Sequence, residues 1–162
     1  MQVRPTVRVL LLDPEDRLLL FRGRLPAEPD SAPFWFTCGG GVEAGETVEA
    51  AALREIFEET GIADADLGPA VWRSEGVMPG IDAGDPPRLF QETFVVARCA
   101  GGALVRDGWT ELEHRFMDDA RWWTLAEIAA SDETIYPVGL ARLLPEVLAG
   151  RWPAEPIMID WG

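Results

Sequence analysis

The sequence predicts a domain of the α/β class, of the α+β type, in which a mixed β-sheet lies between helices. The chain has 162 residues, an ordinary length for one domain, and 48% of them are hydrophobic, enough for a sizeable core. The predicted elements follow the order strands, helix, strands, helix, which is typical of a sheet covered by helices. We therefore expect residues 1–162 to form a single domain.

Three strands are predicted in the first quarter of the chain. Residues 7–13 and 18–23 are rich in strand-forming side chains, and the Pro/Asp turn DPEDR separates them, so they should pair. Residues 34–38 form a short aromatic strand that runs into three glycines. The intervening residues 24–33 contain three prolines and are predicted to be a loop.

A helix is predicted over residues 48–60. This span contains neither Gly nor Pro and is rich in Ala, Leu and Glu. Thr47 is a suitable N-cap residue, and Gly61 stands where a helix commonly ends in a left-handed turn. Both ends of the helix are therefore marked in the sequence.

The second half of the chain is predicted to add strands over residues 69–78, 88–99 and 121–125, with a short strand end at 103–106. The Gly/Asp/Pro segment 79–87 is a candidate substrate loop, because loops on a rigid scaffold often carry binding residues.

Two helices are predicted near the C-terminal end. Thr124 and Glu127 make a capping box that begins a short helix. Residues 137–150 place leucines on one helical face, although Pro145 would kink or break this helix.

The composition excludes several kinds of function. The formal net charge is −14 and the isoelectric point is about 4.4, so binding to a nucleic acid polymer is not expected. All fourteen basic residues are Arg, which excludes lysine chemistry. Two cysteines without a CxxC pair, a secretory signal or a long apolar run indicate free thiols, a cytoplasmic location and no membrane contact. A polyanionic substrate would need a metal ion as a bridge.

Acidic side chains are concentrated on one face of the helix predicted at 48–60. Glu55, Glu58 and Glu59 stand at positions i, i+3 and i+4, so their carboxylates converge. Like charges at these spacings destabilise an isolated helix by about 0.2–0.5 kcal/mol per pair. A hard cation such as Mg²⁺ would offset this repulsion. The alternative is a solvated acidic face.

The residues around this face have a specific spacing. From Gly40 to Ile62 the chain follows G-x5-E-x7-R-E-U-x-E-E-x-G-U, where U is apolar, and every specified position matches. The sequence therefore closely resembles the Nudix hydrolase family. Cys38 stands where the family commonly has Pro. The segments 91–96 and 121–128 resemble later parts of bacterial members, so the resemblance covers nearly the whole chain.

The resemblance implies a Nudix α/β/α sandwich and a reaction. The expected reaction is hydrolysis of a diphosphate bond in a nucleoside diphosphate linked to another group, with Mg²⁺ or Mn²⁺ as cofactor. The expected substrate is a small nucleotide-derived molecule: ADP-ribose, a nucleotide sugar, a dinucleoside polyphosphate or a nucleoside triphosphate. Dimerisation is common in the family, so a homodimer is also expected as one option.

Position by position, the resemblance also implies roles for the box residues. The expected metal ligands are the Gly40 carbonyl, Glu55, Glu58 and Glu59, with Glu55 as a further ligand or a base. Arg54 and Glu46 match a pair that orients the loop and the glutamates. These two are therefore expected to act through their neighbours.

A general base from outside the box is also expected, and two candidates stay open. Glu92 lies on a predicted strand, and Glu113 lies in a predicted loop or turn. For substrate binding we expect Arg22 and Arg24, at the end of a strand, to contact phosphates, and Trp35 to stack on a base.

Two other functions remain as alternatives. One is a noncatalytic Nudix-fold nucleotide-binding sensor; such proteins usually lose box glutamates, which are all present here. The other is an isopentenyl diphosphate isomerase on the same fold. An isomerase needs a catalytic Cys and further His ligands, and the chain has one His.

Overall fold

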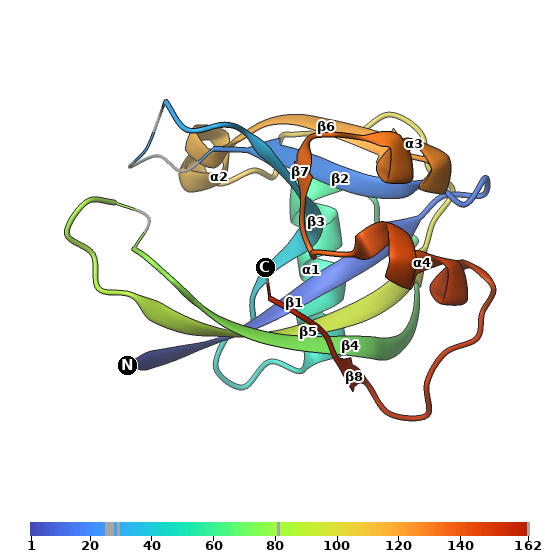
Figure 1. Cartoon of the computed structure of the whole chain (residues 1–162), viewed down its shortest axis with the longest axis horizontal. Coiled ribbons are helices and arrows are strands. Elements are labelled where there is room, and N and C mark those ends of the chain that lie inside the picture. Colours follow the sequence, from blue (N-terminus) through green and yellow to red (C-terminus); the bar gives the residue numbers. More distant parts are fainter. Residues whose placement is uncertain (25–27, 29, 81, 162) are drawn as a thin grey trace.

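The computed structural model describes residues 1–24, 28, 30–80 and 82–161, and its core is a mixed β-sheet between helices (Figure 1). The strand order is β6-β2-β3-β1-β5-β4-β8, with β7 beside β3. The strands are β1 (Gln2–Leu12), β2 (Leu18–Gly23), β3 (Phe34–Gly41), β4 (Asp66–Met78), β5 (Arg88–Arg98), β6 (Met117–Trp123), β7 (Thr134–Ile135) and β8 (Ile157–Met158). The predicted fold class is confirmed.

The central strand β1 makes the sheet mixed. It pairs with β3 in antiparallel orientation and with β5 in parallel orientation over its whole length. Its side chains alternate between two cores, as strand geometry requires. Val7, Val9 and Leu11 pack on one face, and Leu10 and Leu12 pack on the other.

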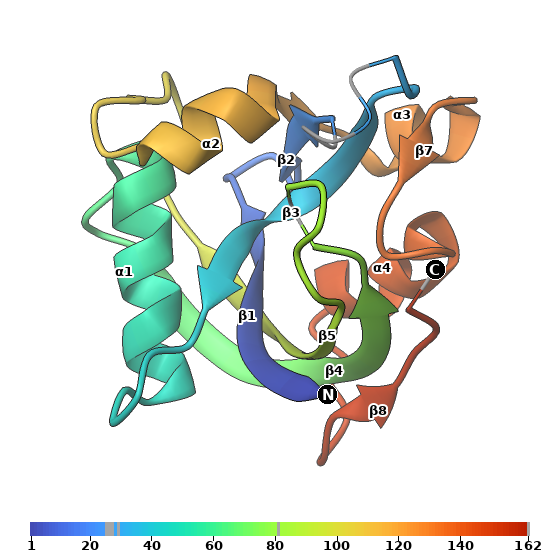
Figure 2. The same ribbon diagram turned by 90° about the vertical axis from the view of Figure 1, so that its left-hand side faces the viewer.

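Helices cover both faces of the sheet (Figure 2). The helices formed by the described residues are α1 (Val48–Thr60), α2 (Glu111–Phe116), α3 (Leu125–Ala130) and α4 (Leu140–Leu148). The helix α1 packs on the first face through Ala51, Ala52 and Ile56. On the opposite face, Ile128 of α3 and Leu144 of α4 pack in the second core. None of these helices has the length and apolar character needed to cross a membrane.

The helix α1 has the predicted bounds and caps. The Thr47 hydroxyl accepts a hydrogen bond from the Ala50 N–H at 3.1 Å. Gly61 has φ +78°, and its N–H donates to the Phe57 carbonyl at 2.9 Å. The helix is therefore held at both ends by local interactions.

Several strands are longer than the sequence predicts, because pairing extends them. β1 begins at Gln2 instead of residue 7, since its first residues pair with β5. β3 continues through the glycines, which pair with Thr6 to Arg8 of β1. β4 begins at Asp66, and β6 lies at 117–123 instead of 121–125 because it pairs along β2.

Other features of the second half differ from the predictions. Residues 103–106 form no strand. The predicted loop around Glu113 is instead the helix α2, which begins with a capping box formed by Thr110 and Glu113. The last helix begins at Leu140 and continues past Pro145 to Leu148. The two-residue strands β7 and β8 were not predicted, because such short pairings depend on tertiary contacts.

Candidate active site

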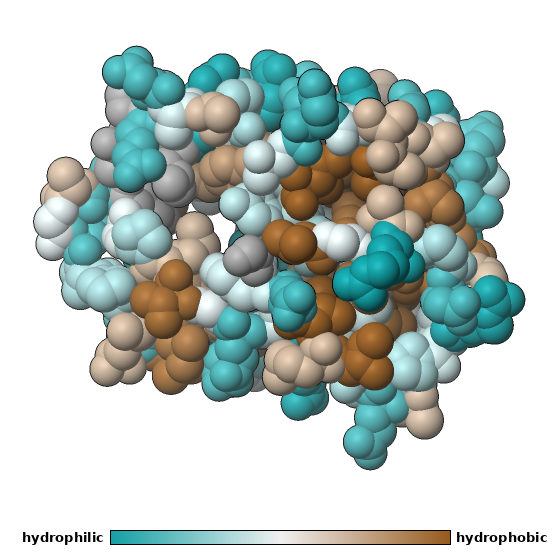
Figure 3. All heavy atoms as spheres, viewed as in Figure 1, coloured by the Kyte–Doolittle hydropathy of each residue, from teal (hydrophilic) through white to brown (hydrophobic). Residues whose placement is uncertain are grey.

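A cavity of about 1190 Å³ lies beside the box residues. Its wall includes the glycines at the end of β3, three glutamates of α1, and side chains of β1 and β5. In the space-filling view the molecule is hollowed on the side where the ends of β4 and β5 project (Figure 3). The cavity is therefore the place where the predicted residues can meet a ligand.

Three carboxylates converge on this cavity. One oxygen each of Glu55, Glu59 and Glu113 lies within 4.8 Å of the others. Glu55 and Glu59 are buried, and Glu113 is half-buried. The first two come from α1 and the third from α2, which lies next to the end of α1 (Figure 2). The Trp109 indole N–H donates to the Glu59 carbonyl at 2.8 Å and ties the chain before α2 to α1.

Burial and repulsion between like charges disfavour the ionised form of the carboxylate cluster. Burial raises the pKa of Glu59 well above its ordinary value, and the charges of Glu55 and Glu113 act in the same direction. Burial also raises the pKa of Glu55, against the effect of Arg54. Buried carboxylate oxygens close to one another suit a hard divalent cation, so the donor set fits Mg²⁺ or Mn²⁺.

The glycines of β3 allow the backbone to touch these carboxylates. The Gly39 N–H donates to Glu59 Oε1 at 2.8 Å, and Gly39 has φ +144°, which disfavours a side chain. A Cβ at Gly40 would overlap the carboxylate of Glu55. The thiol of Cys38 also donates to Glu59 Oε1, at 3.4 Å. The strand and the helix are thus in direct contact at the cluster.

Arg54 connects the loop to the glutamates. Its guanidinium donates two hydrogen bonds to Glu46, at 2.8 and 2.9 Å, and one to the Gly41 carbonyl at 2.9 Å. It also donates to Glu55 at 2.9 Å and to Glu58 at 3.3 Å. The hydrogen bonds from Arg54 lower the pKa of Glu46 to about 2, so Glu46 stays charged. The structure therefore brings together the pair that the sequence predicts.

The two candidate bases have different surroundings. Glu92 lines the cavity, but Arg8 donates to one of its oxygens at 2.6 Å and Ser74 to the other at 3.1 Å. Within the described residues Glu113 accepts one hydrogen bond, from the Thr110 N–H at 3.0 Å, and it belongs to the cluster. Glu58, predicted as a ligand, lies outside the cluster and is more exposed than Glu55 and Glu59.

Arg22, Arg24 and Trp35, the predicted substrate contacts, have other surroundings in the structure. None of the three is among the described residues that line the cavity. Trp35 is buried in the core, where its ring meets Trp123 at a centroid distance of 5.0 Å. Arg22 instead donates to Asp118 at 2.7 Å, and Arg24 lies 3.8 Å from the same carboxylate. Strand alternation explains why Trp35 does not line the cavity, because its side chain points to the opposite face of β3 from those of Phe34 and Phe36.

Other residues of the cavity were missed from the sequence. Arg4, Thr6 and Arg8 line it from β1, and Arg88 and Phe90 line it from β5. They share one face of the sheet because they alternate along paired strands. A first strand predicted from residue 2 would have placed Arg4, Thr6 and Arg8 on one face of the sheet.

The predicted loop 24–33 and the candidate substrate loop 79–87 lie only partly within the described residues. From the first, Glu28, Ser31 and Ala32 line the cavity, and from the second Pro79 does so. Residues 25–27, 29 and 81 of these loops lie outside the described residues.

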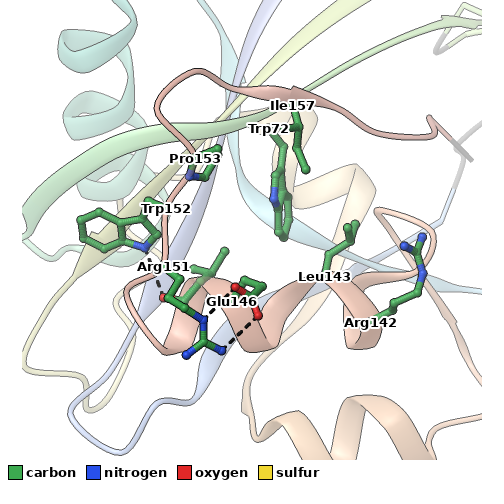
Figure 4. A pocket seen from close by; sticks show the side chains of 9 residues that line it. Trp72, Arg142, Leu143, Glu146, Arg151, Trp152, Pro153 and Ile157 are labelled. Atoms are coloured by element: carbon green, nitrogen blue, oxygen red, sulfur yellow. Dashed lines mark hydrogen bonds and ion pairs between the residues drawn. The ribbon is translucent and has the colours of Figure 1, made fainter.

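A second pocket, of about 360 Å³, lies between α4 and the C-terminal segment (Figure 4). Trp72, Leu143 and Ile157 point into it. Its carboxylate Glu146 is held by Arg151 at 2.9 and 3.0 Å. This pocket therefore resembles an apolar surface hollow more than a catalytic site.

The capping box of α2 provides a test of how Glu113 is positioned. Replacing Thr110 by Val removes the N-cap hydrogen bond, which costs about 1 kcal/mol of stability and loosens Glu113. We expect the kcat/KM for diphosphate hydrolysis to fall about tenfold. The matched control is Thr124→Val, which removes the same cap from α3. If Thr110→Val and Thr124→Val had equal melting temperatures and lost equal amounts of kcat/KM, the positioning role of Thr110 would be contradicted.

Comparisons with known proteins identify a family for this chain. A family model described as the NUDIX domain matches residues 2–145. An RNA pyrophosphohydrolase of Caulobacter vibrioides is 41% identical over 75 residues, 46% of this chain and 40% of that protein. An RNA pyrophosphohydrolase of Wolbachia pipientis subsp. Culex pipiens is 33% identical over 136 residues, 80% of each chain. The alignment thus spans less than half of the Caulobacter protein's length.

Among solved structures, the E. coli ORF135 protein shares the fold, with a TM-score of 0.63 at 23% identity over 96% of each chain. The sequence match, the shared fold and the intact box at the carboxylate cluster lead to one conclusion. The chain belongs to the Nudix hydrolase family.

Proposed function

We propose that this protein hydrolyses a diphosphate bond in a small nucleotide-derived substrate, with Mg²⁺ or Mn²⁺ as cofactor. The observation that carries the proposal is the convergence of Glu55, Glu59 and Glu113 within 4.8 Å at the wall of a large cavity. Membership of the Nudix family supports it. So does the similarity to proteins named RNA pyrophosphohydrolase.

We assign the cation to Glu55, Glu58, Glu59 and the carbonyl of Gly40. When bound, a divalent cation neutralises phosphate oxygens and lowers the pKa of an attacking water. A Cβ at Gly40 would overlap the carboxylate of Glu55, so the Gly40 backbone lies against a residue of this set, which supports the assignment. Glu58 would have to turn from Arg54 to join the others.

We propose Glu113, and not Glu92, as the general base. Both oxygens of Glu92 accept hydrogen bonds from side chains, whereas Glu113 has one oxygen without a protein donor among the described residues. Glu113 would take a proton from the water that attacks a phosphorus atom. The water oxygen then bonds to that phosphorus while the bridging P–O bond breaks, and the bridging oxygen leaves with the bonding electrons.

Arg54 and Glu46 would act as positioning residues. Their two parallel hydrogen bonds fix the guanidinium, whose other N–H groups hold the Gly41 carbonyl and the Glu55 carboxylate. Bidentate pairs of this kind combine strength with a defined geometry. The pair would therefore keep the loop and the catalytic helix in register.

A substrate panel tests the proposal. The purified protein is incubated with ADP-ribose, a nucleotide sugar, a dinucleoside polyphosphate, a nucleoside triphosphate and a 5′-triphosphorylated oligoribonucleotide, and the products are identified by mass. We expect cleavage of a small nucleotide that requires Mg²⁺ or Mn²⁺ and stops with a chelator. Absence of cleavage of every compound would refute the proposal, and tight binding without turnover would favour the sensor alternative. Exclusive cleavage of the oligoribonucleotide would overturn the choice of a small substrate.

The isomerase alternative is disfavoured by the surroundings of Cys38. Its side chain is buried and is not among the described residues that line the cavity. Burial raises the pKa of the thiol well above its ordinary value, and the charge of Glu59 adds to this effect. A thiol in this environment is poorly suited to act on a substrate.

A further inference from the structure

An ion pair at the wall of the cavity has no part in the reaction proposed above. Arg8 of β1 donates through its Nε to Glu92 of β5 at 2.6 Å, and the Ser74 hydroxyl donates to the other oxygen of Glu92 at 3.1 Å. Glu92 and Ser74 are buried, and Arg8 is half-buried. The strands β1, β5 and β4, which carry these residues, lie side by side in the sheet (Figure 1). None of the three residues belongs to the box.

The strand register places Arg8 beside the carboxylate cluster. Arg8 pairs with Gly39 of β3, whose N–H donates to Glu59 Oε1 at 2.8 Å. Neighbouring strands lie only about 4.8 Å apart. The two backbones are in contact here, since a Cβ at Gly39 would approach the Arg8 Cα to 3.0 Å. Arg8 is therefore one strand away from a direct contact of the cluster.

Most of the hydrogen-bond donors of Arg8 are unused. A guanidinium group has five N–H donors, and Glu92 accepts from one of them, at Nε. The two terminal nitrogens donate to no acceptor among the described residues. Within the same residues, the buried side-chain nitrogens that lack a partner are those of Trp35 and Trp123, so the terminal nitrogens of Arg8 are accessible. Because Arg8 lines the cavity, a ligand there can reach these donors.

Arg8 and Glu59 influence each other electrostatically. Burial lowers the pKa of Arg8, but the charges of Glu92 and Glu59 outweigh this effect and raise it, so the guanidinium stays charged. Burial raises the pKa of Glu59, and the charge of Arg8 opposes that shift. The positive charge of Arg8 thus acts at the place where the proposed cation and the substrate phosphates would meet.

Joining two strands does not require this ion pair. The backbones of β1 and β5 already pair over the whole length of β1. Replacing a buried ion pair by apolar side chains is often neutral or stabilising. An arginine that keeps free donors at a cavity is instead suited to bind an oxyanion, since the guanidinium fork matches phosphate geometry.

We propose that Arg8 binds a phosphate oxygen of the substrate's diphosphate group beside the cation, and that Glu92 and Ser74 hold its guanidinium in position. This inference rests on the proposed diphosphate hydrolysis and adds to it a substrate contact from outside the box. Glu92 and Ser74 act through Arg8 and are positioning residues. Their role explains why both oxygens of a carboxylate at the cavity accept hydrogen bonds from the protein.

The test measures binding of methylenediphosphonate, a diphosphate analogue whose bridging carbon prevents hydrolysis. Calorimetry with saturating Mg²⁺ should show a ten- to hundredfold lower affinity in Arg8→Gln, as expected for lost hydrogen bonds to a charged group. Glu92→Gln keeps the arginine and should lose less than tenfold. The matched control is Arg98→Gln, which removes a surface arginine of β5 that pairs with Asp16 outside the cavity lining and should stay within twofold of wild type.

A double variant separates phosphate binding from a purely structural role. Arg8→Gln with Glu92→Gln leaves no unpaired buried charge, so its melting temperature should return toward that of wild type. Its affinity for methylenediphosphonate should stay as low as in Arg8→Gln. Recovery of the affinity together with the stability would overturn the inference, as would an equal loss in Arg98→Gln.

The affinity for the cation provides a second readout. Removing a positive charge near Glu59 does not weaken cation binding electrostatically, so Mn²⁺ should bind Arg8→Gln at least as tightly as wild type. Electron paramagnetic resonance measures this affinity. A parallel loss of Mn²⁺ and methylenediphosphonate affinity would show that Arg8 acts through the structure of the cluster, and would refute the phosphate contact.

These measurements need no turnover, so they distinguish a failure of this inference from a failure of the proposed reaction. Selective loss of methylenediphosphonate affinity in Arg8→Gln supports the contact even if wild type cleaves no nucleotide. Unchanged affinity in Arg8→Gln refutes the contact even if wild type is an active hydrolase. Absence of methylenediphosphonate binding to wild type would also refute it.

Discussion

Glu59→Gln is expected to lower the kcat/KM for diphosphate hydrolysis by about 10³-fold or more, equivalent to about 4 kcal/mol of transition-state stabilisation. The amide keeps the hydrogen bond from the Gly39 N–H, which is 2.8 Å long, and therefore keeps the local structure. It removes the most buried charge of the carboxylate cluster, and with it a ligand of the cation. Steady-state kinetics with saturating Mg²⁺ measure the effect.

The matched control is Glu49→Gln, an exposed glutamate in the first turn of the same helix, outside the cavity lining. It should leave the kcat/KM within about twofold, since surface substitutions away from a site usually have small effects. A loss in Glu59→Gln no larger than in Glu49→Gln would contradict the assigned role.

The same substitution should stabilise the protein when metal is absent. Because burial raises the pKa of Glu59 in the folded state, its stabilising contribution is present below its ordinary value of 4.5 and is lost as the pH rises through the folded value. At pH 7.5 the uncharged Gln therefore raises the melting temperature, by about 2–4 °C per kcal/mol of removed repulsion. Near pH 4 this advantage should disappear. A lower melting temperature for Glu59→Gln at pH 7.5 with a chelator would contradict the electrostatic account.

Glu113→Gln is the second large effect that we expect. Loss of a general base should lower kcat by about 10²- to 10⁴-fold while KM changes much less. The capping hydrogen bond from the Thr110 N–H to the side-chain oxygen can persist, so α2 should stay folded. Rates at saturating substrate, with far-ultraviolet circular dichroism as a folding check, measure the outcome.

Two comparisons make this prediction specific. Glu111→Gln is the matched control on the same helix, exposed and outside the cavity lining. Glu92→Gln weakens the ion pair with Arg8 and should lower kcat less than tenfold. If Glu92→Gln reduced kcat more than Glu113→Gln did, the base assignment would be wrong.

The sequence was sufficient to predict what depends on local spacing. The helix α1, its caps, and the convergence of Glu55 and Glu59 all follow from positions within one helix. The contact between Arg54 and Glu46 was expected from the box and is present. These features need no information about the rest of the fold beyond the glycine loop.

Features that depend on tertiary contacts could not be predicted. Glu113 reaches the cluster because the Trp109 indole binds the carbonyl of Glu59, fifty residues away in the chain. Strand alternation separates Trp35 from Phe34 and Phe36, but the sequence did not indicate which face borders the cavity. Trp161 reaches the cavity only through the pairing of β8 with β4. The cytoplasmic location and the homodimer stay predictions.

The most direct test of the central claim is to measure the affinity of the carboxylate cluster for Mn²⁺. Titration of the metal-free protein with Mn²⁺, followed by electron paramagnetic resonance, measures bound and free metal without requiring a substrate. We predict saturable Mn²⁺ binding in wild type and in Glu49→Gln, and a loss of at least about tenfold in affinity in Glu59→Gln. Equal Mn²⁺ affinity in wild type and Glu59→Gln would contradict the claim that this cluster holds the cation.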